Sequence, residues 1–522
     1  MEDGTKLLKP SRRKFIQSTS LATASLMLPI GFGAGGVRAA TPQRGGTLRV
    51  AMSPGSTSDT LDPMSYVDSP QFTAGLTLAN CLVEIDKDKK PIPELAESWE
   101  SSDAFKRWKF TLRSGVTFHN GKPLTSADVV YSLKRHIAPD STSAAAGLLA
   151  DVDDVVADGD LGVIITHKTG TPDLPIIMGD FHLVIIPEGF TDFANFVGTG
   201  PYKLIRFEPG VVLETERNEN YWKADRAFVD KFDLVFINDS TAAANALMTG
   251  EVQAVSKLGS QLAKRLQSRD GINLITSEGG SCNSLDMNCQ SKLFGDNNVR
   301  TAMKLAIDRQ KMVEFIGSGF GTVGNDNPIP SNDPFFNADI KQREYDPEQA
   351  KFHLKKAGID SLDLTLQVSD AAYSGAVDSA SLLQESAKVA GLNIRIKKEP
   401  EDGYWSNVWL KSDFMAAYFG TRPTPDMMFS IFYKSGAPWN ESHWENKTFD
   451  RLLVEARLTD DFTKRKEIYD EMQQLAHDDS GIAIFMMPSI IDAYASEVQG
   501  AEADGVRTMM GARVAERVWL QG

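Results

Sequence analysis

The stretch PELAESWESSDAFKRWKFTLRSGVTFHNGKPLTSADVVYSLKRH, residues 93–136, combines the signals of a strand, a turn and a helix. Apolar and polar residues alternate over residues 108–112, which predicts a strand with one buried face. Asn120-Gly121 favours a tight turn, because both residues tolerate positive φ. Thr125 suits the N-cap of the helix that follows, whose apolar residues recur at helical spacing. The stretch therefore predicts a compact strand–turn–helix module, and it contains no catalytic signature.

From Leu95 to Ser132 the sequence follows the pattern L-A-x-S-W, an aromatic-rich strand, and L-R-x-G-V-x-F-H-x-G-x-P-L-T-x-x-D-V-V-x-S. This pattern resembles the signature region of family 5 of the extracellular solute-binding proteins, the oligopeptide- and dipeptide-binding receptors of ABC importers. Shorter blocks extend the resemblance along the chain: GGTLRV (45–50), LDP (61–63), GTGPY (198–202), RNENYW (217–222) and VRTAMKLAIDR (299–309).

The resemblance implies an α/β fold of the type II periplasmic binding proteins, with two α/β lobes joined by a hinge and an extra subdomain on the first lobe. A βαβ pattern over residues 362–398 independently predicts a parallel pair of strands. We expect the following division: a signal peptide at 1–39, lobe I at 40–75, 195–277 and 489–522, the extra subdomain at 76–194, and lobe II at 278–488.

The first 39 residues have the features of an export signal. Ser11-Arg12-Arg13-Lys14-Phe15-Ile16 is a twin-arginine motif, and a mild apolar run follows it. That run is shorter than the roughly 20 strongly apolar residues that a membrane span needs, which argues against an anchor. Val37-Arg38-Ala39 offers small residues for cleavage after Ala39, and no Cys stands there for lipid attachment. The sequence therefore predicts a cleaved, soluble periplasmic protein.

Charge and length narrow the class of protein further. The first 39 residues carry a net charge of +4, which leaves −19 for the remainder of a chain whose total is −15. A protein with this net negative charge is not expected to bind nucleic acid or an anionic membrane surface. The length exceeds what one hydrophobic core supports, and so predicts two or three domains.

The three cysteines, Cys81, Cys282 and Cys289, predict no cofactor. Cys282 and Cys289 lie seven residues apart in a strand-like run, about 23 Å when extended. A disulfide needs roughly 4.4–6.8 Å between Cα atoms, so we expect free thiols. The glycine-rich run 317–321 follows a helix rather than a strand, which excludes a dinucleotide loop.

Catalytic motifs are missing from the sequence: it contains no G-x-S-x-G elbow, H-E-x-x-H helix or G-K-[ST] phosphate loop. Its seven histidines are scattered singly. Paired carboxylates are too common in an acidic chain to interpret, so an exported hydrolase acting on sugars or peptides stays open as an alternative function.

Residues 403–445 are rich in aromatic side chains around the turn Gly420–Asp426, and they predict the ligand site. Rings supply apolar area, and an arginine can bind a carboxylate or phosphate through two hydrogen bonds. We expect most of these aromatic residues to be core, with Trp405 and Trp439 the exceptions. A polar loop after the first strand adds a second set of contacts, because α/β folds place ligands at such loops. The candidate ligand-binding residues are Gly55, Ser56, Thr57, Tyr404, Trp405, Arg422, Pro423, Thr424, Asp426, Trp439 and Asn440.

In the peptide receptors that the sequence resembles, an Asp in the loop corresponding to residues 420–426 pairs with the free amine of the peptide. Here Thr421 and Arg422 stand in its place, which predicts an anionic solute such as an opine, a modified peptide or a sugar phosphodiester. The alternative is that Asp426 or another carboxylate of the protein pairs with Arg422. The resemblance implies a monomer that binds a small-molecule or peptide solute and delivers it to an inner-membrane ABC permease.

Overall fold

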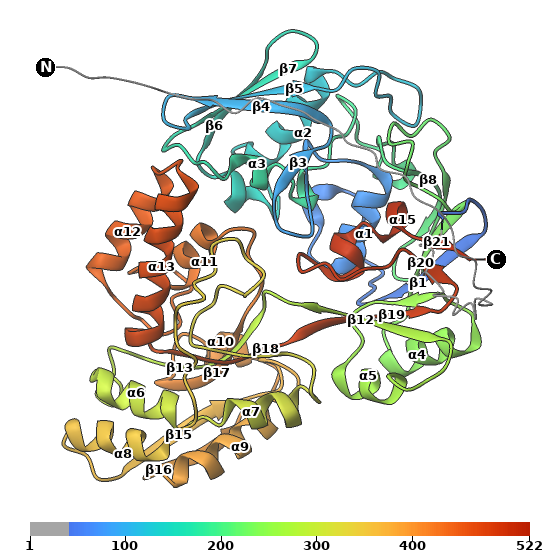
Figure 1. Cartoon of the computed structure of the whole chain (residues 1–522). Helices are drawn as coiled ribbons and strands as arrows, with labels where there is room; N and C mark the ends of the chain where they lie inside the picture. Colours follow the sequence, from blue (N-terminus) through green and yellow to red (C-terminus); the bar gives the residue numbers. More distant parts are fainter. Residues whose placement is uncertain (1–40, 522) are drawn as a thin grey trace, which may run out of the picture. The chain divides into compact units, whose positions relative to one another are not determined.

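The computed structural model describes residues 41–521, so the predicted signal peptide lies outside the described residues. Residues 42–522 form one compact unit. Three larger sheets, with seven, six and four strands, organise that unit (Figure 1). Each of the three has its own hydrophobic core. Among residues 41–521, none of the helices has the length and apolar character that crossing a bilayer requires.

The first lobe is built on a seven-stranded sheet in the order β12-β19-β11-β1-β10-β9-β8. Its central strand β1 pairs in parallel with β10 and β11, and the outer pairs are antiparallel. Helices α4 and α5 pack beside β12 and β19 (Figure 1). The strands are β1 (Thr47–Met52), β8 (Tyr202–Glu208), β9 (Val212–Arg217), β10 (Lys231–Phe236), β11 (Ala254–Val255), β12 (Ile272–Glu278) and β19 (Ser489–Ala495). The helices of this lobe are α1 (Ser69–Leu78), α4 (Ser240–Thr249), α5 (Ser260–Leu266), α14 (Thr508–Ala512) and α15 (Val514–Arg517), and a short pair β20 (Val498–Gln499) and β21 (Trp519–Leu520) lies near the C-terminus.

The extra subdomain contains the stretch 93–136. Its four-stranded antiparallel sheet has the order β4-β5-β7-β6, formed by β4 (Ala96–Ser102), β5 (Arg107–Leu112), β6 (Val152–Ala157) and β7 (Gly162–His167). Trp108, Phe110 and Leu112 are buried along one face of β5, as predicted. Helix α2 (Ser126–Ile137) packs on this sheet, and Thr125 and Asp128 form a reciprocal capping box at its start. The remaining elements are β2 (Val83–Ile85), β3 (Pro91–Pro93) and α3 (Leu174–Ile177).

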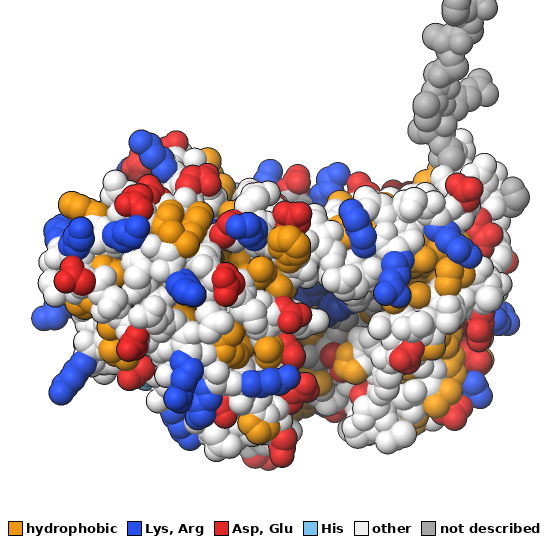
Figure 2. Space-filling model, turned by 90° about the horizontal axis from the view of Figure 1, so that it is seen from below, with side chains coloured by type: hydrophobic (Ala, Val, Ile, Leu, Met, Phe, Trp, Pro, Cys, Tyr) orange, Lys and Arg blue, Asp and Glu red, His pale blue; other side chains and the backbone are white. Residues whose placement is uncertain are grey.

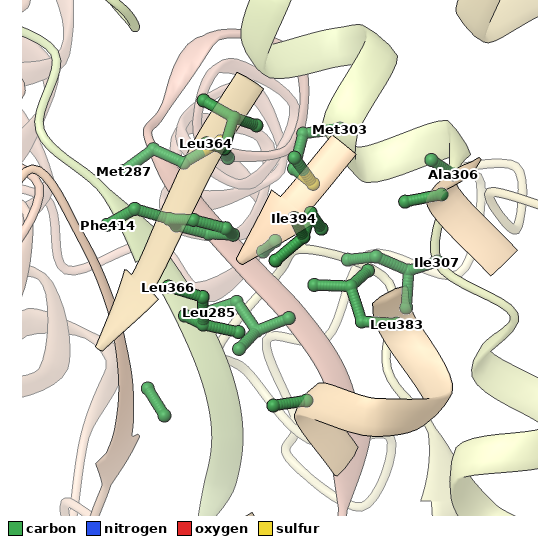
Figure 3. Packing of buried hydrophobic residues seen from close by; sticks show 14 of the residues in the cluster. Leu285, Met287, Met303, Ala306, Ile307, Leu364, Leu366, Leu383, Ile394 and Phe414 are labelled. Atoms are coloured by element: carbon green, nitrogen blue, oxygen red, sulfur yellow. The ribbon is translucent and has the colours of Figure 1, made fainter. Parts of the chain in front are cut away.

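The second lobe is built on a six-stranded sheet in the order β14-β18-β13-β17-β15-β16. The predicted βαβ unit is present, and β15 and β16 pair in parallel. Figure 3 shows the apolar side chains of β13, β15, β16 and β17 packing against those of α6 and α9. The strands are β13 (Cys282–Met287), β14 (Thr322–Val323), β15 (Leu362–Val368), β16 (Leu392–Lys398), β17 (Phe414–Phe419) and β18 (Ile482–Met487). The helices are α6 (Asn297–Leu305), α7 (Arg309–Lys311), α8 (Pro347–Lys356), α9 (Ala376–Lys388), α10 (Tyr404–Asn407), α11 (Pro425–Phe432), α12 (Lys447–Arg457) and α13 (Phe462–Asp479).

The chain passes between the two lobes at two places. β12 ends at Glu278 in the first sheet and β13 begins at Cys282 in the second, and β18 leads back into β19 through Pro488. The first crossing includes Gly279 and Gly280, between the end of β12 and the start of β13. Residues adjoining these crossings are therefore close to both lobes.

Two predicted elements differ from the structure. The apolar run 181–186 predicts a strand, but it begins as a 3₁₀ turn over Phe181–Leu183, because the side chain of Asp180 accepts a hydrogen bond from the backbone N–H of His182. The apolar residues at helical spacing after residue 298 predict a helix that reaches Val313, but the observed helix ends at Leu305. Asp308 then caps a new helical segment by accepting from the N–H of Lys311.

A buried ion network joins the C-terminal segment to the extra subdomain. Nη1 and Nη2 of Arg513 lie 2.7 and 2.9 Å from the two carboxylate oxygens of Glu94, 419 residues away in sequence. Lys223 donates to the same Glu94 and to Glu84 and Glu516. Paired in this way, buried charges hold elements from three parts of the chain in one arrangement.

The surface carries charges of both signs. On the face in Figure 2, Lys and Arg side chains alternate with Asp and Glu side chains, and the face is hollowed near its centre. The net negative charge is therefore spread out on this face rather than gathered into one patch.

Candidate functional site

Four aromatic side chains of the second lobe form a continuous array, which we call the aromatic wall: Trp405, Trp409, Tyr418 and Trp439. Ring centroids lie 5.6 Å apart for Trp405 and Tyr418, 6.0 Å for Trp405 and Trp409, and 5.8 Å for Trp409 and Trp439. Trp405, Tyr418 and Trp439 are 37%, 45% and 45% exposed. Large apolar side chains exposed together, rather than singly, are typical of a binding surface.

The other aromatic residues of this region are core, as the sequence suggested. A buried set packs against α12 and α13 from the far side of the aromatic wall: Phe419, Phe429, Phe432, Tyr433 and Trp444. The predicted exceptions, Trp405 and Trp439, are exposed. Sequence reasoning missed Tyr418 and Trp409 as members of the wall. No local signal identifies Tyr418, because the sequence of β17, FMAAYF, does not alternate and every residue of the strand except Tyr418 is buried.

Arg422 stands at the edge of the aromatic wall. Its guanidinium carbon lies 5.0 Å from the ring centroid of Phe432 and 5.9 Å from that of Trp439. Nη1 donates to the carbonyls of Gly420 and Thr421, at 3.2 and 3.0 Å. No carboxylate within the described residues 41–521 lies within ion-pairing distance of this guanidinium. The remaining N–H donors are thus open to an acceptor from outside the protein.

The alternative partner suggested for Arg422 is engaged elsewhere. Asp426 forms a 2.6 Å ion pair with Nε of Arg457, whose Nη2 also donates to Ser430. Pro425 separates Asp426 from the turn and starts α11, which carries the carboxylate to the side facing α12. Internal neutralisation of Arg422 by Asp426 is therefore not observed.

Two neighbours of Arg422 act on its charge in opposite directions. Burial lowers the pKa of Arg422, Tyr418 raises it, and the charge of Arg507 lowers it. Arg507 comes from the C-terminal segment of the first lobe and stacks on Phe181 and Phe72, 4.3 and 5.3 Å from their centroids. The carboxylate paired with it, Asp180, is 3.9 Å away. Burial lowers the pKa of Arg507, whereas Asp180 and Asp504 raise it, so these carboxylates offset part of its charge.

Three other predicted ligand-binding residues, Tyr404, Thr424 and Asn440, form hydrogen bonds within the second lobe. Tyr404 is buried and donates to the carbonyl of Ala416. Thr424 caps α11 by accepting from the N–H of Met427, and Pro423 links it to Arg422. The buried amide of Asn440 donates to the carbonyls of Lys434 and Trp444 and accepts from the N–H of Trp444.

The loop after β1 is braced within the first lobe. The N–H and carbonyl of Gly55 both hydrogen-bond to the side-chain amide of Asn238, and a Cβ at this glycine would come within 2.5 Å of Phe236. Ser56 donates its N–H to Asp59, and Thr57 is exposed. The hydrogen-bond partners of Gly55 and Ser56 all belong to the first lobe, so these contacts do not bring the loop to the aromatic wall.

A cavity of about 790 Å³ lies between the β2–β3 hairpin and the second lobe. Its lining includes Lys87, Lys90, Asp173, Phe335 and Arg465. Sequence patterns did not predict this cavity, because its lining residues come from four separate segments, within residues 87–91, 172–176, 331–335 and 462–465.

Comparisons with known proteins agree with this architecture. The model of the bacterial extracellular solute-binding proteins, family 5, matches residues 90–441. The dipeptide-binding protein of Escherichia coli K12 is 27% identical, with 84% of this chain and 90% of that protein covered. The glutathione-binding protein GsiB of Pectobacterium atrosepticum is 26% identical, with 85% and 90% covered.

Among solved structures, the periplasmic binding protein DppA of Helicobacter pylori in complex with the peptide STSA shares the fold, with a TM-score of 0.74 at 23% identity. The alignment covers 92% of this chain and 99% of that one. The two lobes, the extra subdomain and the two chain crossings agree with the family match, which covers most of the chain. The chain belongs to family 5 of the bacterial extracellular solute-binding proteins.

Proposed function

We propose that this protein is the periplasmic binding component of an ABC importer and that it captures an anionic, peptide-like solute. The two lobes close over the solute, and the closed form delivers it to the inner-membrane permease. Family membership and relatives named as dipeptide- and glutathione-binding proteins support the importer role. The observation that carries the choice of an anion is Arg422, a half-buried cation with no carboxylate partner within residues 41–521.

Arg422 gives the turn at residues 420–426 a positive charge, which favours an anionic solute. A guanidinium is always protonated and presents a planar set of donors that fits a carboxylate or a phosphodiester. Removing such a group from water without a counter-charge is costly, so a solute that supplies the anion gains binding energy. An opine, a modified peptide or a sugar phosphodiester meets this requirement, whereas an unmodified cationic dipeptide does not.

The aromatic wall supplies the second element of recognition. Trp405 and Trp439 present ring faces or edges to solvent on either side of Trp409, and Tyr418 extends the surface along β17. A planar or extended solute can bury apolar area there while its anionic group reaches Arg422. Binding without turnover is the expected outcome, so the solute leaves the protein chemically unchanged.

Native mass spectrometry of the protein purified from its host should reveal a retained solute with a carboxylate or phosphate. Isothermal titration calorimetry with that solute, or with glutathione as a probe, then compares the wild type with Arg422→Ala. We expect affinity to fall by about 2–5 kcal/mol while the melting temperature of the solute-free protein barely changes. Arg451→Ala is the matched control, because Arg451 is an exposed arginine of the same lobe, paired only with Glu455.

Two results would contradict the proposal. A variant Arg422→Ala that binds normally but melts earlier would make the arginine structural. Conversion of the retained solute during incubation, seen as a product mass, would support a hydrolase instead.

A further inference from the structure

A pair of buried carboxyl groups lies directly behind the aromatic wall. Asp286 is on β13, the strand between β17 and β18, and Glu441 follows Trp439 by two residues. Their carboxyl groups lie close enough to hydrogen-bond to each other if one is protonated, and the residues are only 1% and 3% exposed. Neither carboxyl forms an ion pair with a Lys, Arg or His within residues 41–521, and no other group there hydrogen-bonds to the two oxygens of Asp286 or to Oε2 of Glu441.

Two carboxyl groups can hydrogen-bond only when one of them carries a proton, because an ionised carboxylate has no donor. The surroundings favour that state. Burial raises the pKa of Asp286 to about 6, and burial together with the charge of Asp286 raises the pKa of Glu441 well above its usual range. At neutral pH the pair therefore holds one proton and one negative charge.

The groups that face this pair from neighbouring elements are uncharged. The hydroxyls of Tyr404 on α10, of Tyr433 at the end of α11 and of Tyr373 before α9 are close enough for the charge of Asp286 to raise the pKa of each. Ser284 lies two residues before Asp286 on the same strand. These described neighbours therefore supply no positive charge to the Asp286–Glu441 pair. Among them, only the shared proton offsets the negative charge of the two carboxyl groups.

Glu441 also contacts the aromatic wall itself. The indole Nε1–H of Trp409 donates to Oε1 of Glu441. Trp409 stands between the two exposed tryptophans, 6.0 Å from Trp405 and 5.8 Å from Trp439. Glu441 therefore fixes the orientation of the Trp409 ring through Oε1. The proton that Glu441 shares with Asp286 in turn fixes the orientation of the Glu441 carboxyl group.

We propose that Glu441, held by the proton it shares with Asp286, is a positioning residue that orients Trp409 and thereby shapes the surface on which the solute binds. The expected effect on solute binding rests on the proposed function, whereas the expected effect on the orientation of Trp409 in the aromatic wall does not. Loss of the shared proton at alkaline pH leaves two negative charges in contact within the core. They separate, and the indole loses its fixed acceptor.

The experiment compares Glu441→Gln, Glu441→Leu and Asp286→Asn with the wild type. A glutamine keeps the acceptor for Trp409 and donates permanently to Asp286, and an asparagine at 286 donates permanently to Glu441. Leucine supplies neither group. Near-ultraviolet circular dichroism of the solute-free proteins from pH 6 to pH 10 reports the tryptophan array, because coupled indoles give strong signals there. Glu445→Gln, an exposed glutamate in the same loop, is the matched control.

The wild type should lose part of its tryptophan signal as the pH rises, while Glu441→Gln and Asp286→Asn keep the neutral-pH spectrum throughout. Glu441→Leu should lack that spectrum at every pH and bind the retained solute about tenfold or more weakly. If Glu441→Leu does not fold, the pH profiles of Glu441→Gln and Asp286→Asn, compared with that of the wild type, still test the proposal. A pH-independent wild type, or amide variants that follow the wild-type profile, would overturn the proposal. Altered spectra without any solute binding would instead count against the proposed function alone.

Discussion

Arg465 on α13 and Asp173, just before α3, form a buried ion pair with 2.7 Å between nitrogen and oxygen. Their side chains are 8% and 6% exposed. The pair joins the second lobe to the extra subdomain. Nearby, Lys89 and Asp333 form a second buried pair at 3.6 Å, with the charges in the opposite order, since here the subdomain supplies the cation. This boundary is therefore held by paired charges, beside the cavity that both pairs line.

Removal of one partner from the Arg465–Asp173 pair should be strongly destabilising. Asp173→Ala leaves the guanidinium buried with only Tyr469 as a hydrogen-bond acceptor among its described neighbours, and we expect a loss of about 3–5 kcal/mol in the free energy of unfolding. Urea unfolding monitored by fluorescence gives this number. Lys466→Ala, which breaks a half-exposed pair with Asp470 one residue further along α13, should cost less than about 1 kcal/mol. Equal losses for the two variants would refute the argument.

His119 should make stability dependent on pH below neutrality. Its Nδ1 accepts from the N–H of Gly198 and its Nε2 faces the carbonyl of Gly200 at 3.1 Å, which suits a neutral imidazole. Burial lowers its pKa from 6.5 to about 4. The unfolded chain takes up the proton first, so the stabilisation is complete above pH 6.5 and is lost as the pH falls towards 4.

The variant His119→Gln isolates this contribution. The free energy of unfolding of the wild type should fall relative to that of the variant by on the order of 2 kcal/mol between pH 7 and pH 4, since the side chain is partly exposed. Denaturant titrations at several pH values measure the difference. A difference that stays constant across this range would show that His119 does not titrate in this way.

The three thiols should be present and slow to react. Cys81 and Cys282 are fully buried, Cys289 is partly buried, and all three are free. Burial raises the pKa of each thiol, which reduces the fraction of reactive thiolate. Ellman's reagent should therefore titrate three thiols in guanidinium chloride and almost none in the native protein within minutes. Non-reducing peptide mapping that links Cys282 to Cys289 would contradict the extended strand β13.

Export should remove the first 39 residues without lipid attachment. The expected product in a periplasmic extract begins at Ala40, and its intact mass matches the unmodified chain. Replacement of Arg12 and Arg13 by lysine should leave the precursor in the cytoplasm, whereas replacement of the nearby Lys9 by arginine should not. A lipid-bearing mass, or a product that still begins at Met1, would exclude this route.

Local signals in the sequence predicted the elements whose hydrogen bonds are local. Thr125 and Asp128 stand three residues apart and cap α2 together, and Gly250 ends α4 in the left-handed conformation that glycine permits. The two failures have the same cause. Asp180 and Asp308 are ordinary polar residues in a pattern of apolar ones, but each side chain binds a backbone N–H and so diverts the chain from the predicted strand or helix.

Composition predicted which region carries exposed aromatic residues, but it could not predict the contacts within the candidate site. The excess of aromatic residues and the unusual Arg422 identified the region, and the predicted exposure of Trp405 and Trp439 is confirmed. The contact between Asp286 and Glu441 joins residues 155 positions apart, and periodicity gives no information about such a pair. The internal hydrogen bonds of Asn440 likewise become evident only in three dimensions, and its role as a ligand contact stays a prediction.

The bond between Arg513 and Glu94 has a consequence for biosynthesis. Glu94 leaves the ribosome 419 residues before its partner Arg513. Strand β19, which separates β11 from β12 in the first sheet, is also made late. The first lobe therefore cannot complete its sheet until β19 has been made, and contacts of such long sequence separation slow folding. Until then the nascent chain has to stay soluble with an unfinished first-lobe core.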